Sequence, residues 1–221
     1  MDTTLSPTLR KQVNRAIGIL KKGGVVAYPT DTVYGLGACM TSLPAVERIF
    51  EIKGRHKGMA LPLLVADREQ IKQIAVSIPP TAWRLACNFL PGALTLVLLK
   101  SPAVPDIITG GGKTIAVRIP DHPVPLALLR QLGEPIIGTS ANFSGKPPAL
   151  TAEEVKSQLG DKVDMVIDGG RCPGGVESTV LDLTKKKPTV LRLGAVSLEQ
   201  LQRTDPDIML ATEVKNAHRH R

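Results

Sequence analysis

Apolar residues recur every three or four positions between Leu9 and Leu20, and Gly23-Gly24 then interrupts the pattern. This spacing places the apolar side chains on one face of a helix. Glycine often follows the last helical turn because it readily adopts a left-handed backbone. The pattern therefore predicts an amphipathic helix over residues 8–22, followed by a short buried strand over Val25–Tyr28.

Helical and strand-like segments alternate along the rest of the chain. Such alternation is typical of an α/β protein, and two adjacent strands near the end favour a mixed sheet. Neither an internal repeat nor a low-complexity linker divides the chain, so we expect one α/β (α+β mixed) domain. Further helices are expected over residues 43–52, 67–75, 80–89, 123–132, 151–159 and 197–203. Further strands are expected over residues 61–65, 94–99, 114–119, 136–138, 163–167, 178–183 and 190–193.

The predicted strand over residues 114–119 separates two kinds of side chain. Side chains alternate between the faces of a strand, so its valine and isoleucines share one face, and Arg118 lies on the other face near Ala116. A poorly solvated guanidinium needs an anionic partner. Arg118 is therefore either a ligand for an anion or an ordinary ion-paired residue.

Composition indicates an aliphatic core and no membrane span. The 221 residues are 43% hydrophobic and 3% aromatic, enough to bury a sizeable core. The longest apolar stretch, Leu94–Leu99, is far below the ~20 residues that cross a bilayer. The first residues lack the pattern of a signal peptide. We expect a soluble, cytoplasmic protein.

Charge favours polyanionic partners, whereas the cysteines suggest no metal site. The net charge of +8 attracts nucleotides or RNA, although the runs Lys185–Lys187 and Arg219–Arg221 are also typical of a solvated turn and tail. Cysteines stand at positions 39, 87 and 172, far apart and without a C-x-x-C pair. This spacing favours neither a disulfide framework nor zinc, and we assign no metal ligands.

Three polar segments are candidates for anion or substrate binding. Lys53-Gly54-Arg55 ends a predicted helix, where an ammonium and a guanidinium can converge on phosphate or simply complement the helix dipole. Gly138–Gly145 follows a strand, and its small hydroxylated residues either approach an anion or form a turn. Thr30–Thr32 is a polar loop that either binds a ligand or satisfies its own backbone.

The segment Gly110–Thr114 imitates the end of a Walker A loop but does not fit it. The full motif needs glycine at position 107, where the chain has isoleucine. The segment also leads into a predicted strand, whereas a P-loop leads into a helix. We do not expect P-loop chemistry.

Six short segments together resemble the YrdC-like family of threonylcarbamoyl-AMP synthases. They follow the family's order and cover roughly residues 10 to 200. They are Pro29–Gly37, Lys53–Arg55, Ala116–Arg118, Gly138–Asn142, Glu177–Val180 and Leu191–Gly194.

This resemblance implies a fold and a reaction. The fold is a twisted, open, mixed sheet flanked by helices, with a basic concave groove. The reaction is that of an L-threonylcarbamoyladenylate synthase, a nucleotidyltransferase that forms threonylcarbamoyl-AMP and pyrophosphate from ATP, L-threonine and bicarbonate or CO₂ for tRNA modification. Mg²⁺ is expected with ATP. Further partners left open are tRNA or double-stranded RNA and the tRNA-modification proteins that use the adenylate.

The resemblance also implies roles for the matching residues. Lys53 and Arg55 would act electrostatically on the phosphates of ATP. No strong general base is needed, because the carbamate of threonine is already anionic, so catalysis would depend on positioning and charge. The other ATP-binding positions are Thr114, Ser140, Asn142 and Arg192. The L-threonine-binding positions are Thr32, Arg118, Gly138 and Ser178.

Three positions depart from the family pattern. His56 stands where many relatives have proline, and we expect it on the surface. Leu64 lies in a segment that lacks a histidine found in some members, and Pro148 replaces a serine. These departures leave the amino-acid preference open.

We expect one YrdC-like domain over residues 8–203, with a short head over 1–7 and a flexible basic tail over 204–221. This organisation resembles the short, single-domain form of the family. The leading alternative function is an RNA-binding module on the same fold, without adenylate synthesis, although few aromatics are available for base stacking. A second alternative is a carbamoyl-adenylate-forming enzyme of hydrogenase maturation, whose companion domains are not seen in this sequence.

Overall fold

The structure is a computed structural model that describes residues 5–212 and 214. Residues 1–4 of the expected head, and residues 213 and 215–221 of the expected tail, lie outside the described residues. No helix within the described part of the chain is long and apolar enough to cross a membrane.

The first helix, α1 (Pro7–Lys21), lies within one residue of the predicted bounds 8–22 at both ends. The Ser6 hydroxyl accepts a hydrogen bond from the backbone N–H of Leu9 at 3.2 Å, satisfying a donor that the first turn leaves free. Its buried residues recur at helical spacing and face the core. Gly23 follows with a φ of 79°, a conformation that glycine adopts without strain.

The other helices agree closely with the expected segments. The additions are two short elements, α5 and η1, that have too few residues to show a period. The helices are α2 (Leu43–Lys53), α3 (Arg68–Ile74), α4 (Pro80–Phe89), α5 (Asp106–Thr109), α6 (Pro123–Leu132), α7 (Ala152–Leu159) and α8 (Leu198–Gln202), with a 3₁₀ turn η1 (Gly160–Lys162).

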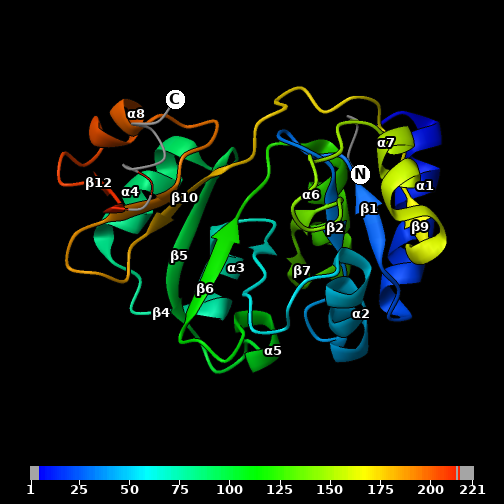
Figure 1. Ribbon diagram of the computed structural model, residues 1–221, viewed down its shortest axis with the longest axis horizontal. Coiled ribbons are helices and arrows are strands. Elements are labelled where there is room, and N and C mark those ends of the chain that lie inside the picture. The colour runs from blue at the N-terminus through cyan, green and yellow to red at the C-terminus, as the bar shows by residue number, and fades with distance from the viewer. Residues whose placement is uncertain (1–4, 213, 215–221) are drawn as a thin grey trace.

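The strands divide between two sheets that lie side by side (Figure 1). The smaller sheet has the order β8-β2-β1-β9. It contains β1 (Val26–Tyr28), β2 (Gly35–Gly37), β8 (Thr139–Ser140) and β9 (Met165–Val166).

The larger sheet has the order β12-β11-β10-β5-β6-β3-β7, and β4 pairs with β5. Both sheets combine parallel and antiparallel neighbours. The strands are β3 (Leu63–Leu64), β4 (Ala75–Val76), β5 (Leu94–Lys100), β6 (Thr114–Arg118), β7 (Ile136–Ile137), β10 (Thr179–Asp182), β11 (Thr189–Arg192) and β12 (Met209–Leu210).

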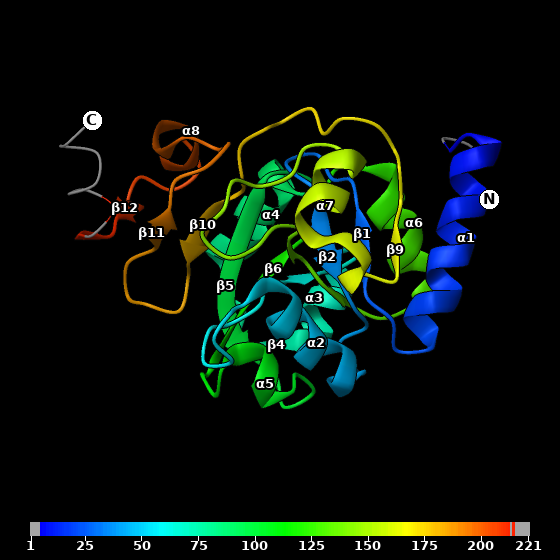
Figure 2. The same ribbon diagram turned by 45° about the vertical axis from the view of Figure 1, so that its right-hand side comes forward.

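The smaller sheet is buried on both faces. Along the chain at β1, Val25 and Ala27 join one core cluster, and Val26 and Tyr28 join another. The second cluster contains α1 and α6, which pack beside the sheet (Figure 2). The alternation follows from the two-residue repeat of a strand.

The larger sheet has one core face and one partly open face. Apolar side chains of β5 and β6, such as Leu96 and Val117, pack into the core with α3 and α4. The alternate residues Thr95, Ala116 and Arg118 line a pocket on the other face. The face assignment predicted from the sequence for Arg118 is therefore confirmed.

The chain passes directly from the larger sheet to the smaller one at Gly138. Strand β7 ends at Ile137 and β8 begins at Thr139, and a Cβ at Gly138 would collide with the side chain of Leu64. An isolated bridge between Cys39 and Ile136 also joins the two sheets. The loop between β1 and β2 lines the same pocket as Gly138, so segments of both sheets meet at this crossing.

The mixed α/β class with helix-flanked mixed sheets is confirmed, with two differences in detail. The sequence led us to expect one sheet, whereas the hydrogen bonds define two. Residues 209 and 210, expected within a flexible tail, form β12 and pair with β11. The apolar triplet Ile208–Leu210 holds β12 against the protein, because Ile208 is buried in the core and Leu210 packs against it.

Candidate active site

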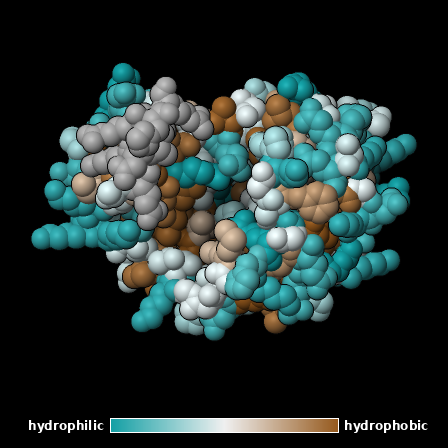
Figure 3. All heavy atoms as spheres, viewed as in Figure 1, coloured by the Kyte–Doolittle hydropathy of each residue, from teal (hydrophilic) through white to brown (hydrophobic). Residues whose placement is uncertain are grey.

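A pocket of about 280 Å³ opens between the two sheets. Figure 3 shows this face hollowed near its centre, where hydrophilic surface meets hydrophobic surface. Its lining combines the β1–β2 loop, the chain crossing at Gly138 and the open face of the larger sheet. Seven predicted site residues line it: Thr32, Arg55, Arg118, Gly138, Ser140, Ser178 and Arg192.

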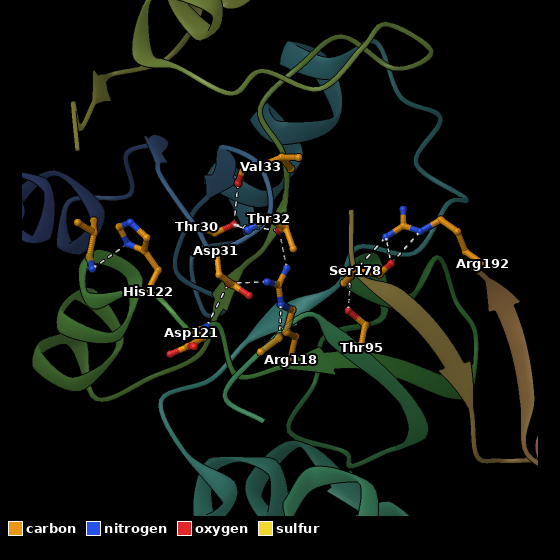
Figure 4. A network of polar contacts seen from close by, with 12 residues as sticks. Thr30, Asp31, Thr32, Val33, Thr95, Arg118, Asp121, His122, Ser178 and Arg192 are labelled. Carbon is orange, nitrogen blue, oxygen red and sulfur yellow. Dashed lines mark hydrogen bonds and ion pairs between the residues drawn. The ribbon is translucent and has the colours of Figure 1, made fainter. Parts of the chain in front are cut away.

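Arg118 is fixed at one end of the pocket by three hydrogen bonds (Figure 4). Its Nη2 donates to Asp31 Oδ1 at 2.5 Å and its Nη1 donates to Thr32 Oγ1 at 2.9 Å. Its Nε donates to the carbonyl of Gly92 at 2.8 Å. The side chains of Arg118 and Asp31 are only 8% and 14% exposed. The guanidinium is thus held rigidly, and two of its five N–H donors have no acceptor among the described residues.

The Thr30–Thr32 loop supports this end of the pocket through its hydroxyl groups. Thr30 Oγ1 donates to the carbonyl of Val33 at 2.7 Å and lies 3.0 Å from Thr32 Oγ1. The backbone N–H of Thr32 also donates to Thr30 Oγ1 at 3.1 Å. The loop therefore satisfies its own backbone, which is one of the two expected readings, and it also holds Arg118 in place.

A row of polar side chains continues from Arg118 across the larger sheet (Figure 4). Thr95 on β5 forms a hydrogen bond of 2.8 Å with the hydroxyl of Ser178, which precedes β10. Arg192 on β11 donates to the carbonyl of Ser178 through Nε at 3.2 Å and Nη2 at 2.9 Å. The row thus begins and ends with an arginine.

Thr95 is a pocket residue that the sequence did not lead us to select. The signal was present in the strand pattern, because Thr95 is the one hydroxyl in the run Leu94–Leu99. The two-residue repeat places Thr95 on the other side of the strand from Leu94 and Leu96. The pairing of β5 with β6, which the sequence pattern does not specify, then puts it on the same sheet face as Arg118.

Lys53 is turned into the protein instead of being displayed at the helix end. Its ammonium donates to the backbone carbonyls of Ser140 and Asn142, the latter at 2.8 Å, and the residue is 2% exposed. Burial and, to a smaller extent, the charge of the neighbouring Arg55 lower the pKa of Lys53 to about 8, and the charge of Glu177 opposes the change. Lys53 thus fixes the loop that carries Ser140.

Asn142 and Thr114 do not line the pocket. The Asn142 amide donates to the carbonyls of Phe143 and Lys146 at 2.9 and 2.7 Å, which closes the turn of its own loop. Its Oδ1 is buried and has no hydrogen-bond donor among the described residues. Thr114 begins β6, at the opposite end of that strand from Arg118.

Arg55 reaches the pocket from the segment after α2. Gly54 ends that helix with a φ of 58°, and the Arg55 Nη2 donates to the carbonyl of Ala60 at 2.8 Å. Burial lowers the pKa of Arg55, Arg192 lowers it further, and Glu177 opposes the change. Arg55 and Arg192 therefore create positive potential at the same end of the pocket.

The positions that depart from the family pattern lie in different environments. His56 is exposed, as expected, and its Nδ1 accepts from the backbone N–H of Gly58 at 3.0 Å. Leu64 lines the pocket, so an apolar side chain stands there. Pro148 is partly buried outside it. The Gly110–Thr114 segment ends the short helix α5 and enters β6, confirming that it does not lead into a helix.

No group of three or more His, Cys, Asp or Glu side chains suitable for a metal ion occurs within the described part of the chain. Glu177 is the one carboxylate among the residues lining the pocket, and it is paired with Arg192 at 2.9 Å. The described pocket lining therefore offers a single carboxylate to a metal ion.

Comparisons with known proteins agree on one family. A family model for Sua5, YciO and YrdC proteins, described as telomere recombination, matches residues 18–194. The threonylcarbamoyl-AMP synthase of Pyrococcus abyssi is 45% identical over 199 residues, covering 90% of this chain and 58% of that protein. The threonylcarbamoyl-AMP synthase of Bacillus subtilis is 43% identical over 192 residues, covering 86% of this chain and 56% of that protein.

Structural similarity leads to the same group. The crystal structure of P. abyssi Sua5 complexed with L-threonine superposes with a TM-score of 0.88 at 45% identity, covering 90% of this chain and 58% of that chain. The present chain thus spans a little under three-fifths of the length of these relatives.

Proposed function

Because this chain belongs to the Sua5/YciO/YrdC family, we propose that it forms L-threonylcarbamoyl-AMP and pyrophosphate from ATP, L-threonine and bicarbonate or CO₂. The adenylate would then serve threonylcarbamoyladenosine modification of tRNA. The relatives named as threonylcarbamoyl-AMP synthases support the reaction, and the threonine complex of P. abyssi Sua5 supports the amino acid.

One observation carries the proposal at the level of chemistry. A single pocket has the fixed guanidinium of Arg118 at one end and the guanidinium groups of Arg55 and Arg192 at the other. Strands β6, β5, β10 and β11 are consecutive neighbours, so three strand spacings of ~4.8 Å separate the backbones that carry Arg118 and Arg192 by roughly 14 Å. That separation suits an amino acid beside the phosphates of a nucleotide.

At the Arg118 end, we assign the residues to the amino acid. Two N–H groups of Arg118 have no acceptor among the described residues, and a guanidinium can donate two hydrogen bonds to the two oxygens of a carboxylate. Thr32 and Ser178 would contribute hydroxyl contacts, and Gly138 would let the backbone approach closely. This arrangement orients the threonine amine toward the nucleotide, where it captures CO₂ as a carbamate and releases a proton.

At the other end, we assign the residues to ATP. Arg55 and Arg192 would neutralise phosphate charge, and Ser140 would contact the nucleotide from a loop that Lys53 holds in place. The contacts proposed for Thr114 and Asn142 would need the nucleotide to extend beyond the pocket lining. Magnesium would arrive with ATP, held by phosphate oxygens and water.

The bond-forming step follows from this placement. A carbamate oxygen attacks the α-phosphorus and forms a P–O bond, and the bond from phosphorus to the bridging oxygen breaks as pyrophosphate leaves. The carbamate is already an anion, so no side chain needs to remove a proton at this step. Positioning and charge neutralisation supply the catalysis.

The experiment that tests this proposal measures pyrophosphate release from ATP by the purified chain with magnesium. Release that requires both L-threonine and bicarbonate would support it, and mass spectrometry should then detect threonylcarbamoyl-AMP. Absence of release, together with salt-dependent RNA binding, would instead favour the RNA-binding module that the net charge of +8 also suggests.

A further inference from the structure

Glu177 is the one acidic side chain in a pocket otherwise lined by cationic, hydroxyl and apolar groups of the described chain. Arg118 has its own buried counter-ion, Asp31, which lies behind it and does not line the pocket. No comparable buried carboxylate serves Arg55 and Arg192 among the described residues. Glu177 is therefore the one carboxylate of the described pocket lining that can balance the positive charge of Arg55 and Arg192.

Glu177 is directed at the cationic end of the pocket. Its Oε2 accepts a hydrogen bond from Arg192 Nη1 at 2.9 Å, and the two side chains are 38% and 44% exposed. Its negative charge also acts on Lys53 and Arg55, where it opposes the lowering of both pKa values. One accessible carboxylate thus balances part of the charge of three cations.

Arg192 does not depend on Glu177 for its position. Its Nε and Nη2 donate to the backbone carbonyl of Ser178 at 3.2 and 2.9 Å. The backbone of Glu177 is fixed separately, because its carbonyl accepts from the N–H of Ala195 at 3.0 Å. If the Glu177 carboxylate moved away, Arg192 would stay in the pocket with Nη1 available to another anion.

We propose that the Glu177 carboxylate is the internal counter-anion of this end of the pocket and exchanges with a polyphosphate group for Arg192 Nη1. This inference rests on the proposed function in taking polyphosphate as the ligand class. Glu177 acts through Arg192 as a positioning residue: it holds Nη1 while the pocket is empty, limits polyphosphate affinity and promotes release of pyrophosphate. Its removal should strengthen anion binding, whereas loss of a merely structural contact would weaken it.

The size of the effect follows from Coulomb's law. One unit charge at about 6 Å, with an effective dielectric constant between roughly 40 and 80, changes an affinity about threefold to tenfold. Because both partners are accessible to solvent, added salt should reduce the difference.

The test is isothermal titration of inorganic pyrophosphate into the full chain and its Glu177→Gln variant, without divalent metal, at low and high ionic strength. Glu177→Gln should bind pyrophosphate about threefold to tenfold more tightly at low salt, with a smaller difference at high salt. Glu177→Asp, which keeps the charge, should remain closer to the wild type. Equal or weaker binding by Glu177→Gln would overturn the proposal.

Glu69→Gln is the matched control, because Glu69 forms an exposed ion pair with Lys72 at 2.8 Å on α3 and the same charge is lost. It should leave pyrophosphate affinity unchanged, and a matching increase in this variant would assign the effect to net charge and reject the role of Glu177. Glu177→Ala gives a second test if the glutamine variant unfolds. A gain in affinity only when magnesium is omitted, with a loss when it is present, would make Glu177 a metal ligand and also overturn the proposal.

Turnover separates this inference from the function on which it rests. If the wild type releases no pyrophosphate with threonine and bicarbonate but Glu177→Gln still binds pyrophosphate more tightly, the synthase reaction fails and the counter-anion role stands. If the wild type turns over and Glu177→Gln binds pyrophosphate more weakly, the reaction stands and the counter-anion role fails.

Discussion

Arg118 and Arg192 define the two ends of the pocket, yet their charges are balanced differently. Arg118 is paired with a nearly buried carboxylate, Asp31, so it can accept a ligand without moving. Arg192 is paired with the half-exposed Glu177 and is anchored mainly by a backbone carbonyl. On the proposed function, the Arg118 end would orient the amino acid, and the Arg192 end would exchange anions reversibly.

Replacing Arg118 with alanine should affect both stability and substrate use. Loss of one partner from a buried ion pair costs about 3–5 kcal/mol, because Asp31 is left with an uncompensated charge. The Arg118→Ala variant should also show a higher KM for threonine, with the KM for ATP little changed. Urea unfolding and steady-state pyrophosphate release measure the two effects.

The double variant Asp31→Asn, Arg118→Ala separates the effect on stability from the effect on threonine use. It should recover part of the lost free energy of unfolding, because the orphaned charge is gone, but it should not recover threonine use. Recovery of threonine use in the double variant would show that Arg118 acts only through folding.

Lys53 predicts a pH dependence for nucleotide binding. Burial lowers its pKa to about 8. As the pH rises through this value, the ammonium loses its proton, and with it the charge that strengthens its hold on the loop carrying Ser140. ATP affinity should therefore fall between pH 7 and 9.5, whereas a Lys53→Met variant should bind weakly with no such dependence. Titrations across this range measure it, and a flat profile for the wild type would contradict the assignment.

The same group affects stability with the opposite slope. In the unfolded chain Lys53 has its ordinary pKa of 10.5, so between about pH 8 and 10.5 the unfolded state holds more protons than the folded state. By linkage, the contribution of Lys53 to the free energy of unfolding rises with pH across this window. As the pH increases, the contribution of Lys53 to the free energy of unfolding should thus rise while the affinity for ATP falls.

At the residue scale, sequence predicted the chemistry better than the orientation of side chains. The two-residue repeat of β6 correctly placed Arg118 on the open face. It could not show that Asp31 pairs with it, since that contact joins residues far apart in the chain. Lys53 was expected to be displayed with Arg55 at the helix end, but its ammonium donates to the backbone carbonyls of Ser140 and Asn142 and is buried.

At the element scale, long periodic segments were predictable and very short ones were not. The helices α4 and α6 match their expected bounds. Strands β2, β4, β8 and β12 have two or three residues each, too few to establish alternation. They form because neighbouring strands offer hydrogen-bonding partners, as when Leu36 in β2 pairs with Ala27 and Thr139.

The segment 167–178 connects β9 to β10 without regular structure and passes over the top of the molecule in Figure 1. It is attached to the pocket loop, because the N–H of Gly175 donates to the carbonyl of Thr32 at 2.9 Å. A Cβ at Gly174 would lie 2.6 Å from the carbonyl oxygen of Asp31. The absence of a side chain at Gly174 therefore permits the close approach.

Gly174→Ala should push this segment away from Asp31 and Thr32. We expect a loss of about 1–3 kcal/mol in the free energy of unfolding, as for other overpacked positions, and weaker threonine binding. Chemical unfolding and calorimetry with threonine measure these effects. Unchanged values for both would show that the segment yields without disturbing the loop.

Gly18→Ala provides the control for a glycine without close neighbours. Gly18 is exposed within α1, and nothing lies within 4 Å of an added Cβ. Alanine should stabilise the chain by about 0.5–1 kcal/mol because it restricts the unfolded backbone. Ligand binding should not change, so the two variants differ in the sign of their effect on stability.

At the scale of the whole molecule, the division into two sheets was not predictable from strand patterns. Strands β7 and β8 are separated only by Gly138, yet they belong to different sheets. Sequence periodicity assigns a residue to a face, but it does not specify which distant strand will be its neighbour. The pocket depends on this long-range pairing.

Tyr28 forms a hydrogen bond between the two sheets, and its removal tests how much that bond stabilises the fold. It is fully buried in β1, and its hydroxyl donates to the carbonyl of Ile137 in β7 at 2.8 Å. Tyr28→Phe should lower the free energy of unfolding by about 1–2 kcal/mol, since a buried carbonyl loses its donor. Equilibrium unfolding in urea measures this, and an unchanged midpoint and slope would mean that water or another donor replaces the hydroxyl.

The pocket draws on residues from Thr30 to Arg192, held by strands and loops of both sheets. A fragment with only part of this range cannot assemble it, so ligand occupancy and global folding form one linked equilibrium. A ligand at one hundred times its Kd adds about 2.7 kcal/mol to the folded state. The melting temperature of the intact chain thus becomes a general reporter of occupancy, by which amino acids and nucleotides can be ranked before any product is detected.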